Sequence, residues 1–400
     1  MRKLCLFMFF LLLFVALATP YALAAQTNEN EAIQPREHIL EGAPQAQAQA
    51  AILYEATTGT VLYQKNEKEA LPPASVTKVM TLLLVAEAIQ AGKISLDDKV
   101  IISENAASMG GSQVFLKEGE QMSVEELLKC TVIASANDAS VALAEHVAGS
   151  EEAFVKRMND RSKELSLLGC NFENTTGLDD TVTNHTMSAE AIAQLSAMLI
   201  QYDFITKYSS LWQDTIRNGE FTLTNTNRLV RYYEGCNGLK TGSTDKAGYC
   251  ITVSAKRGNL SLICVIMGAD SKESRNEAAR ALLDFGFASV ALYHSPMARL
   301  EEVPVYRSEV KSVYICEQGF SFLCQKGSDK RIEKVYEIPE HLVAPFEAGE
   351  NVGRVVYLLD GKEIGEAKIT AETEAKRLSY LKMLRFVLMS ISTGDNLSKK

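Results

Sequence analysis

Apolar residues recur at helical spacing over several stretches in the first three quarters of the chain. The strongest of these patterns follows Pro72-Pro73, stops before Gly92 and is apolar on nearly every face. A helix of that kind belongs in the middle of a domain. Ser123 and Glu126 form a capping-box pattern, which marks the start of a second helix. The spacing predicts helices over 76–89, 124–132, 138–147, 151–167, 189–200 and 271–290.

Apolar segments with strand character lie on both sides of these helices. Thr57-Thr58-Gly59 separates two of them as a hairpin turn would, and Arg257-Gly258-Asn259 separates two longer ones. The predicted strands cover 51–55, 60–64, 239–243, 248–256 and 260–268. Together the elements predict an α+β fold, with a five-stranded antiparallel sheet flanked by helices.

From about residue 299 the pattern changes to short β-segments punctuated by glycine and proline. Asp360-Gly361 is a strong hairpin signal among them. We therefore predict a small all-β domain over 299–372, after a larger domain over 48–298. Residues 25–47 are polar and rich in Gln, Ala and Glu, which predicts a flexible leader.

The N-terminal residues have the pattern of a secretory signal peptide. Arg2 and Lys3 precede an apolar run over 4–18, and Ala22-Leu23-Ala24 supplies the small residues of a cleavage site. The alternative is a retained membrane helix, but the run is short for a full span. We predict that residues 1–24 are a signal peptide and that the protein is exported.

The C-terminal residues predict an amphipathic helix within 373–400. Lys376, Arg377, Lys382 and Arg385 lie among leucines at helical spacing, and the longest apolar stretch there is far too short to cross a bilayer. Such a helix is typical of proteins that lie on an anionic membrane surface. The alternative is a helix packed on its own domain.

Charge and cysteine content limit the possible partners. A net charge of −9 without a basic stripe over the domain at 48–298 disfavours nucleic acid as a partner. Most cysteines lie inside apolar runs, which favours buried free thiols; only Cys316 and Cys324, around a probable turn at Gly319, have the spacing of a local bridge. The five histidines are scattered and form no metal-site spacing with cysteines or acids, so neither a metal nor a cofactor is expected.

Three short polar motifs occur in a fixed order, Ser75-Val76-Thr77-Lys78, Ser135-Ala136-Asn137 and Lys240-Thr241-Gly242. Copies of the first two recur elsewhere in the chain, so only their order and predicted local structure are informative. Ser75 and Lys78 lie one helical turn apart, where the lysine can take the serine proton if its pKa falls by roughly 3 units. Burial and the second cation Lys240 would lower that pKa.

The other motifs suit the binding of a peptide substrate. Asn137 follows a break between two helices and offers both a donor and an acceptor to a substrate amide and to Lys78, while Ser135 would relay a proton to the leaving amine. Lys240 and Thr241 suit a terminal carboxylate, and Gly242 lets a substrate backbone approach closely. Each motif taken singly also has a structural interpretation. Ser75 fits a helix start, Ser135-Ala136-Asn137 fits an N-capping loop, and Lys240-Thr241-Gly242 fits the end of a strand.

In combination the motifs resemble those of penicillin-recognising serine enzymes. The stretches Pro73–Lys78 and Gly238–Gly242, followed by Ala247-Gly248-Tyr249-Cys250, are similar to the serine D-alanyl-D-alanine carboxypeptidases. The resemblance implies the transpeptidase/β-lactamase-like fold, and an oxyanion hole formed by the backbone N–H groups of Ser75 and Ser243. A class A β-lactamase would add a Glu-x-x-Leu-Asn loop, and this sequence contains no Leu-Asn pair.

The resemblance also implies a substrate and a place of action. The enzyme would remove the terminal D-alanine from peptidoglycan stem pentapeptides through a Ser75 acyl-enzyme. β-Lactams would inhibit it by acylating the same serine, and it would work at the outer face of the cytoplasmic membrane. Two alternatives stay open, a DD-endopeptidase acting on peptidoglycan cross-links and a non-catalytic wall-binding scaffold. His185 follows the segment Asn174–Leu178, and we interpret it as structural or as part of a cleft wall.

Overall fold

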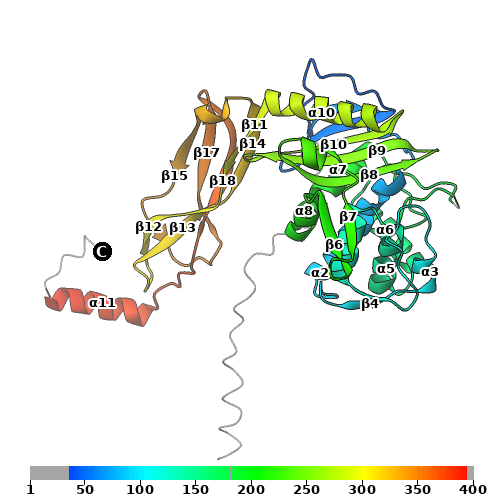
Figure 1. Cartoon of the computed structure of the whole chain (residues 1–400). Coiled ribbons are helices and arrows are strands. Elements are labelled where there is room, and N and C mark those ends of the chain that lie inside the picture. The colour runs from blue at the N-terminus through cyan, green and yellow to red at the C-terminus, as the bar shows by residue number, and fades with distance from the viewer. Residues whose placement is uncertain (1–35, 181, 394–400) are drawn as a thin grey trace, which may run out of the picture. The chain divides into compact units, whose positions relative to one another are not determined.

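The computed structural model describes residues 36–180 and 182–393 (Figure 1). The predicted signal peptide and the first part of the predicted leader lie outside these residues. Among the described residues, no helix has both the length and the apolar character that a membrane span requires.

The main sheet contains the five predicted strands in antiparallel pairs, in the order β3-β2-β10-β9-β8. These strands are β2 (Ala50–Glu55), β3 (Thr60–Lys65), β8 (Cys236–Thr244), β9 (Gly248–Arg257) and β10 (Leu260–Ala269). A two-residue strand, β1 (Arg36–Glu37), pairs in parallel with β3 at the edge of the sheet. It lies in the range predicted as a flexible leader, and its pairing occupies backbone groups of β3 that an edge strand otherwise leaves unpaired.

Helices cover both faces of this sheet (Figure 1). On β9, Ser196 of α7 (Ala189–Leu199) contacts Thr252 at 2.8 Å between the hydroxyl oxygens. The neighbouring Ile251 and Val253 instead join the apolar cluster that contains residues of α10 (Lys272–Ser289). Since successive side chains of a strand point to opposite faces, α7 and α10 pack on opposite sides of the sheet.

The helix predicted to lie in the middle of the domain is α2 (Lys78–Gln90), and most of its residues are buried. Other predicted helices are confirmed as α4 (Val124–Ile133), α5 (Asn137–Ala148) and α6 (Glu151–Glu164). Sequence reasoning missed short elements with little periodicity: η1 (Ala74–Thr77), α3 (Glu104–Ala107), α8 (Asp203–Ser209), α9 (Leu229–Tyr232) and the hairpins β4 (Lys99–Ile101) with β5 (Gln121–Ser123) and β6 (Gln213–Ile216) with β7 (Phe221–Thr224).

The C-terminal part is β-rich, as the pattern predicts, and has its own apolar core around Ile315, Val355, Tyr357 and Ile369. One sheet has the order β15-β17-β18-β13-β12-β16, and β11 pairs with β14 in another. The strands are β11 (Val290–Ser295), β12 (Ala298–Tyr306), β13 (Ser312–Glu317), β14 (Phe320–Gln325), β15 (Ile332–Glu337), β16 (Leu342–Val343), β17 (Asn351–Leu359) and β18 (Lys362–Ala371). A helix, α11 (Tyr380–Thr393), follows them.

All seven cysteines among the described residues are free thiols. Cys316 lies on β13, which pairs with β12 and β18, whereas Cys324 lies on β14, which pairs with β11. The two strands thus belong to different sheets, and the local bridge that the spacing allowed is not formed.

Candidate active site

The first motif spans the junction between η1 and α2. Ala74 has a positive φ of 48°, which turns the chain into η1 and places Ser75 one turn before Lys78. The Nζ atom of Lys78 lies 3.0 Å from the Oγ atom of Ser75. The predicted pair of nucleophile and base therefore forms a direct hydrogen bond.

Lys78 is fully buried and has two further partners. Its Nζ donates to Oδ1 of Asn137 at 2.6 Å and to the backbone carbonyl of Thr176 at 2.8 Å. Burial, and secondarily the charge of Lys240, hold the pKa of Lys78 well below its ordinary value. A neutral amine that donates to these two acceptors keeps its lone pair for the third direction, toward Ser75. The geometry suits proton removal from the serine hydroxyl.

The second motif lies where α4 ends and α5 begins. Ser135 is buried and has a positive φ of 63°, which separates the two helices. Both the backbone and the side chain of Asn137 are held by hydrogen bonds. Its backbone N–H donates to the carbonyl of Ser112 and its Nδ2 donates to the carbonyl of Gly110, each at 2.7 Å. With Nδ2 committed as a donor, Oδ1 is the atom that faces Lys78.

The third motif lies on β8 beside Ser75. A Cβ atom on Gly242 would come within 2.7 Å of the backbone nitrogen of Ser75, so only glycine allows this approach. Lys240 is buried, and burial together with the charge of Arg275 lowers its pKa to about 7. The Thr241 hydroxyl donates to Oγ1 of Thr226 at 2.8 Å. Ser243 follows on the same strand, opposite Tyr249 of β9.

Sequence reasoning missed the contribution of the segment Asn174–Leu178. Its Thr176 carbonyl is one of the two acceptors of Lys78. Gly177 has a φ of 79°, and a Cβ atom there would lie 1.8 Å from the carbonyl oxygen of Ala74. The Oδ1 atom of Asn174 accepts the Thr176 N–H at 3.2 Å, which is an Asx-turn, and also the Gly177 N–H at 2.7 Å. An asparagine at the start of such a turn is a signal that the sequence already contained.

His185 is buried and contacts the first motif at Thr77, in agreement with a structural role. Its Nδ1 accepts the backbone N–H of Glu173 at 3.1 Å, so the ring proton lies on Nε2. The Nε2–H then donates to Oγ1 of Thr77 at 2.8 Å, while that hydroxyl donates to the carbonyl of Ala74. Burial lowers the pKa of His185 to about 4, which keeps the ring neutral.

Comparisons with known proteins agree on one family. The family model described as D-alanyl-D-alanine carboxypeptidase matches residues 37–271, and that of the penicillin-binding protein 5 C-terminal domain matches residues 294–377. The chain is 41% identical over 346 residues to D-alanyl-D-alanine carboxypeptidase DacF of Bacillus subtilis, which covers 85% of this chain and 88% of that protein. It is 34% identical over 333 residues to carboxypeptidase DacC of Escherichia coli, with 80% and 82% covered.

Solved structures show the same similarity. Penicillin-binding protein 5 of Haemophilus influenzae superposes with a TM-score of 0.68 and 33% identity, covering 84% of this chain and 99% of that one. Penicillin-binding protein D2 of Listeria monocytogenes, solved with ampicillin bound, superposes with a TM-score of 0.57 and 30% identity over 62% of this chain and all of that one, 100%.

Proposed function

This chain belongs to the D-alanyl-D-alanine carboxypeptidase family of serine peptidases, and we propose that Ser75 is the nucleophile with which it removes the terminal D-alanine from peptidoglycan stem pentapeptides. One observation carries the assignment. The Oγ atom of Ser75 lies 3.0 Å from a buried lysine amine whose other partners are both hydrogen-bond acceptors.

Acylation begins when Lys78 takes the proton of the Ser75 hydroxyl. The Oγ atom attacks the carbonyl carbon of the penultimate D-alanine, and the backbone N–H groups of Ser75 and Ser243 stabilise the oxyanion. The bond to the terminal D-alanine nitrogen then breaks, and Ser135 relays the proton to that leaving amine. Water, deprotonated by the same base, attacks the ester and releases the shortened peptide from Ser75.

Recognition of the substrate is assigned to Asn137 and the third motif. Asn137 would bind the substrate amide. Lys240 and Thr241 would bind the terminal carboxylate, and Gly242 would allow the substrate backbone to lie along β8. A β-lactam carries a carboxylate and a reactive carbonyl in similar positions, so we expect β-lactams to acylate Ser75 and to remain bound.

We also infer export and attachment to the outer face of the cytoplasmic membrane. The N-terminal pattern of the sequence supports export. On α11, Leu381, Leu384 and Leu388 are exposed by 77%, 46% and 59%, beside the basic residues Lys382 and Arg385. An exposed apolar stripe with cations around it is the composition of a helix that lies in a membrane surface.

The test of the proposed reaction is D-alanine release from a diacyl-Lys-D-Ala-D-Ala peptide by the chain without residues 1–24. Release that benzylpenicillin and Ser75→Ala both abolish is the expected result. Penicillin labelling of Ser75 without release would favour an endopeptidase acting on cross-links. Absence of labelling would contradict an enzyme and favour a wall-binding scaffold.

A further inference from the structure

The segment that holds Asn137 has no regular secondary structure of its own. Residues 110–116 lie between α3 and β5 and form neither helix nor strand. Two of their carbonyls, from Gly110 and Ser112, accept hydrogen bonds from Asn137. Without a helix or sheet to fix these carbonyls, other contacts must set their position.

One set of contacts comes from Asp138, the residue after Asn137. Its buried carboxylate accepts the backbone N–H groups of Val114 and Leu116 at 3.0 and 3.1 Å. These bonds attach the end of the segment to the start of α5. They use the N–H groups of Val114 and Leu116. The carbonyls of Val114 and Phe115 bind a different partner.

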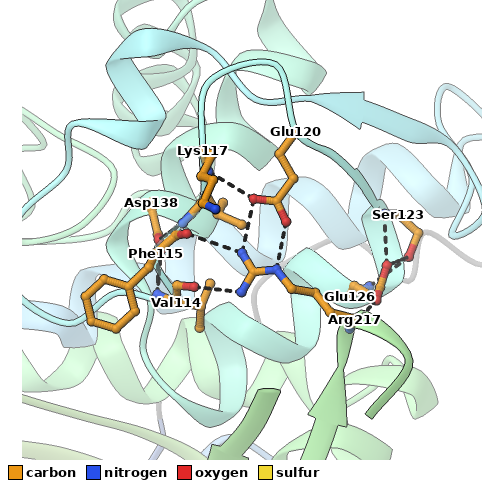
Figure 2. A network of polar contacts seen from close by, with 9 residues as sticks. Val114, Phe115, Lys117, Glu120, Ser123, Glu126, Asp138 and Arg217 are labelled. Atoms are coloured by element: carbon orange, nitrogen blue, oxygen red, sulfur yellow. Dashed lines mark hydrogen bonds and ion pairs between the residues drawn. The ribbon is translucent and has the colours of Figure 1, made fainter. Parts of the chain in front are cut away.

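That partner is Arg217, which lies at the tip of the β6–β7 hairpin (Figure 2). Its Nη1 donates to the carbonyl of Val114 at 3.0 Å and its Nη2 to the carbonyl of Phe115 at 3.3 Å. The same guanidinium forms a two-bond contact with Glu120, from Nε to Oε1 at 2.7 Å and from Nη2 to Oε2 at 3.1 Å. A planar guanidinium is suited to hold several acceptors at fixed angles.

Arg217 is itself anchored to the protein behind it. Its φ of 53° is positive, and its backbone N–H donates to Oε1 of Glu126 at 3.0 Å. Glu126 is the residue that closes the capping box at the start of α4. Arg217 thus contacts α4, which leads into Ser135, through its backbone N–H, and the segment that holds Asn137 through its guanidinium.

We propose that Arg217 is a positioning residue for Asn137, acting through the carbonyls of segment 110–116. Loss of the guanidinium would free the carbonyls of Val114 and Phe115 and allow Gly110 and Ser112 to shift. The amide of Asn137 would then no longer be held at 2.6 Å from the Nζ of Lys78. The inference rests on the proposed roles of Lys78 and Asn137 in catalysis.

The chain offers a matched control in a second Arg–Glu pair of the same domain. Nη2 of Arg161 lies 2.7 Å from Oε1 of Glu87, and these side chains are exposed by 17% and 20%. Nε of Arg217 lies 2.7 Å from Oε1 of Glu120, and these side chains are exposed by 22% and 20%. Arg161 is on α6, and its ion-pair partners Glu87 and Glu164 lie outside the three motifs. Arg161→Gln therefore removes a comparable ion pair away from segment 110–116.

The experiment compares Arg217→Gln with Arg161→Gln in D-alanine release, with kcat expressed per serine titrated by labelled penicillin. Because unfolded molecules are not titrated, lost stability alone does not change this kcat. We expect kcat of Arg217→Gln to fall on the order of 10- to 100-fold with little change in KM, as for a misplaced catalytic group. Arg161→Gln should keep the parent values of both.

Two further variants keep the test decisive. Arg217→Lys keeps a positive charge near Glu120, but its ammonium group cannot bind both carbonyls as the planar guanidinium does. We therefore expect its kcat to lie between those of Arg217→Gln and the parent. If Arg217→Gln does not fold, Arg217→Lys takes its place in the test. Glu120→Gln should lower kcat by less than Arg217→Gln does, and the effects of the two substitutions should not be additive.

Parent-like kcat in the Arg217 variants, or an effect on KM alone, would overturn the proposal. Failure of the proposed reaction is a separate outcome, since the parent itself would then release no D-alanine.

Discussion

Lys78 and Lys240 are both buried, yet the proposed mechanism requires them in opposite charge states. Lys78 must be neutral to take a proton, and burial followed by the charge of Lys240 lowers its pKa. Lys240 must carry its charge to attract a carboxylate, and its pKa is lowered only to about 7. At the scale of single residues, the site works in the pH range where these two conditions overlap.

This pair of conditions predicts the pH dependence of the enzyme. In the free enzyme, kcat/KM should rise as Lys78 loses its proton and fall as Lys240 loses its own, with the falling limb near its pKa of about 7. In Lys240→Arg the cation stays charged, so the falling limb should move to higher pH. The measurement is the kcat/KM profile for D-alanine release, and a falling limb that stays in place would show that another group controls it.

Gly242 gives a second prediction at the residue scale. In Gly242→Ala, the new methyl group would press on the backbone nitrogen of Ser75, which is 2.7 Å from the added Cβ, and would disturb the oxyanion hole. We expect acylation by penicillin to slow by about 10²- to 10³-fold, the usual cost of a lost oxyanion donor. Gly319→Ala is the control, because its Cβ would make only ordinary contacts, the nearest at 3.6 Å. Equal rates in the two variants would contradict the assignment.

At the scale of elements, irregular segments hold in place the groups of the candidate site that helices and strands carry. α2 supplies Lys78 and β8 supplies Lys240, but the acceptor from Thr176 and the carbonyls that hold Asn137 come from loops. Loops can present backbone groups in directions that helices and strands do not allow, at the cost of needing special conformations.

Gly177 tests whether the loop 174–178 sets the geometry of the first motif. Gly177→Ala adds a Cβ atom 1.8 Å from the carbonyl of Ala74, whereas Gly149→Ala meets nothing within 4 Å; both have a positive φ, of 79° and 88°. Gly149→Ala should cost only the left-handed strain of about 1–2 kcal/mol in unfolding free energy. Gly177→Ala should be less stable than Gly149→Ala and should lose nearly all acylation by penicillin. Thermal unfolding and labelling with penicillin measure the two effects. Equal stability and equal labelling in the two variants would show that the loop tolerates displacement.

At the scale of the whole molecule, the main sheet and the C-terminal β-sheet each have an apolar core of their own. One core lies between the main sheet and α10, and the other lies within the C-terminal β-sheet. The three motifs belong entirely to the first part, so the proposed attachment concerns the second part and α11.

The proposed membrane contact predicts an effect on binding without an effect on catalysis. Leu384→Glu with Leu388→Glu should reduce sedimentation with vesicles of phosphatidylglycerol and phosphatidylcholine at least tenfold, because the apolar face of α11 would become charged. D-Alanine release from a soluble peptide should not change. Met297→Glu, at a side chain exposed by 65% outside α11, is the control. Unchanged vesicle binding in the double variant would favour a helix that packs on its own domain.

Much of the fold and the family followed from the sequence because their signals are local or periodic. The apolar surface of α2, the capping box at Ser123 and the turn between the apolar segments of β9 and β10 each predicted an element that is confirmed. The hairpin β6–β7 was missed because its strands are short and mostly polar, so no apolar periodicity marks them. Arg217 was missed for the same reason, since nothing near it in sequence indicates its contact with residues about a hundred positions earlier.

The sequence by itself determined which groups are available to the site: a serine and a lysine one helical turn apart, an asparagine after a helix break and a lysine on a strand. Those relations depend on neighbours in the chain, which local backbone geometry fixes. Only the tertiary structure decided their charge states and directions. The low pKa of Lys78 needs burial among distant segments, and its orientation needs acceptors from Asn137 and Thr176, which are 59 and 98 residues away. Desolvation and hydrogen-bond geometry arise only when such segments pack together, and no spacing along the chain encodes them.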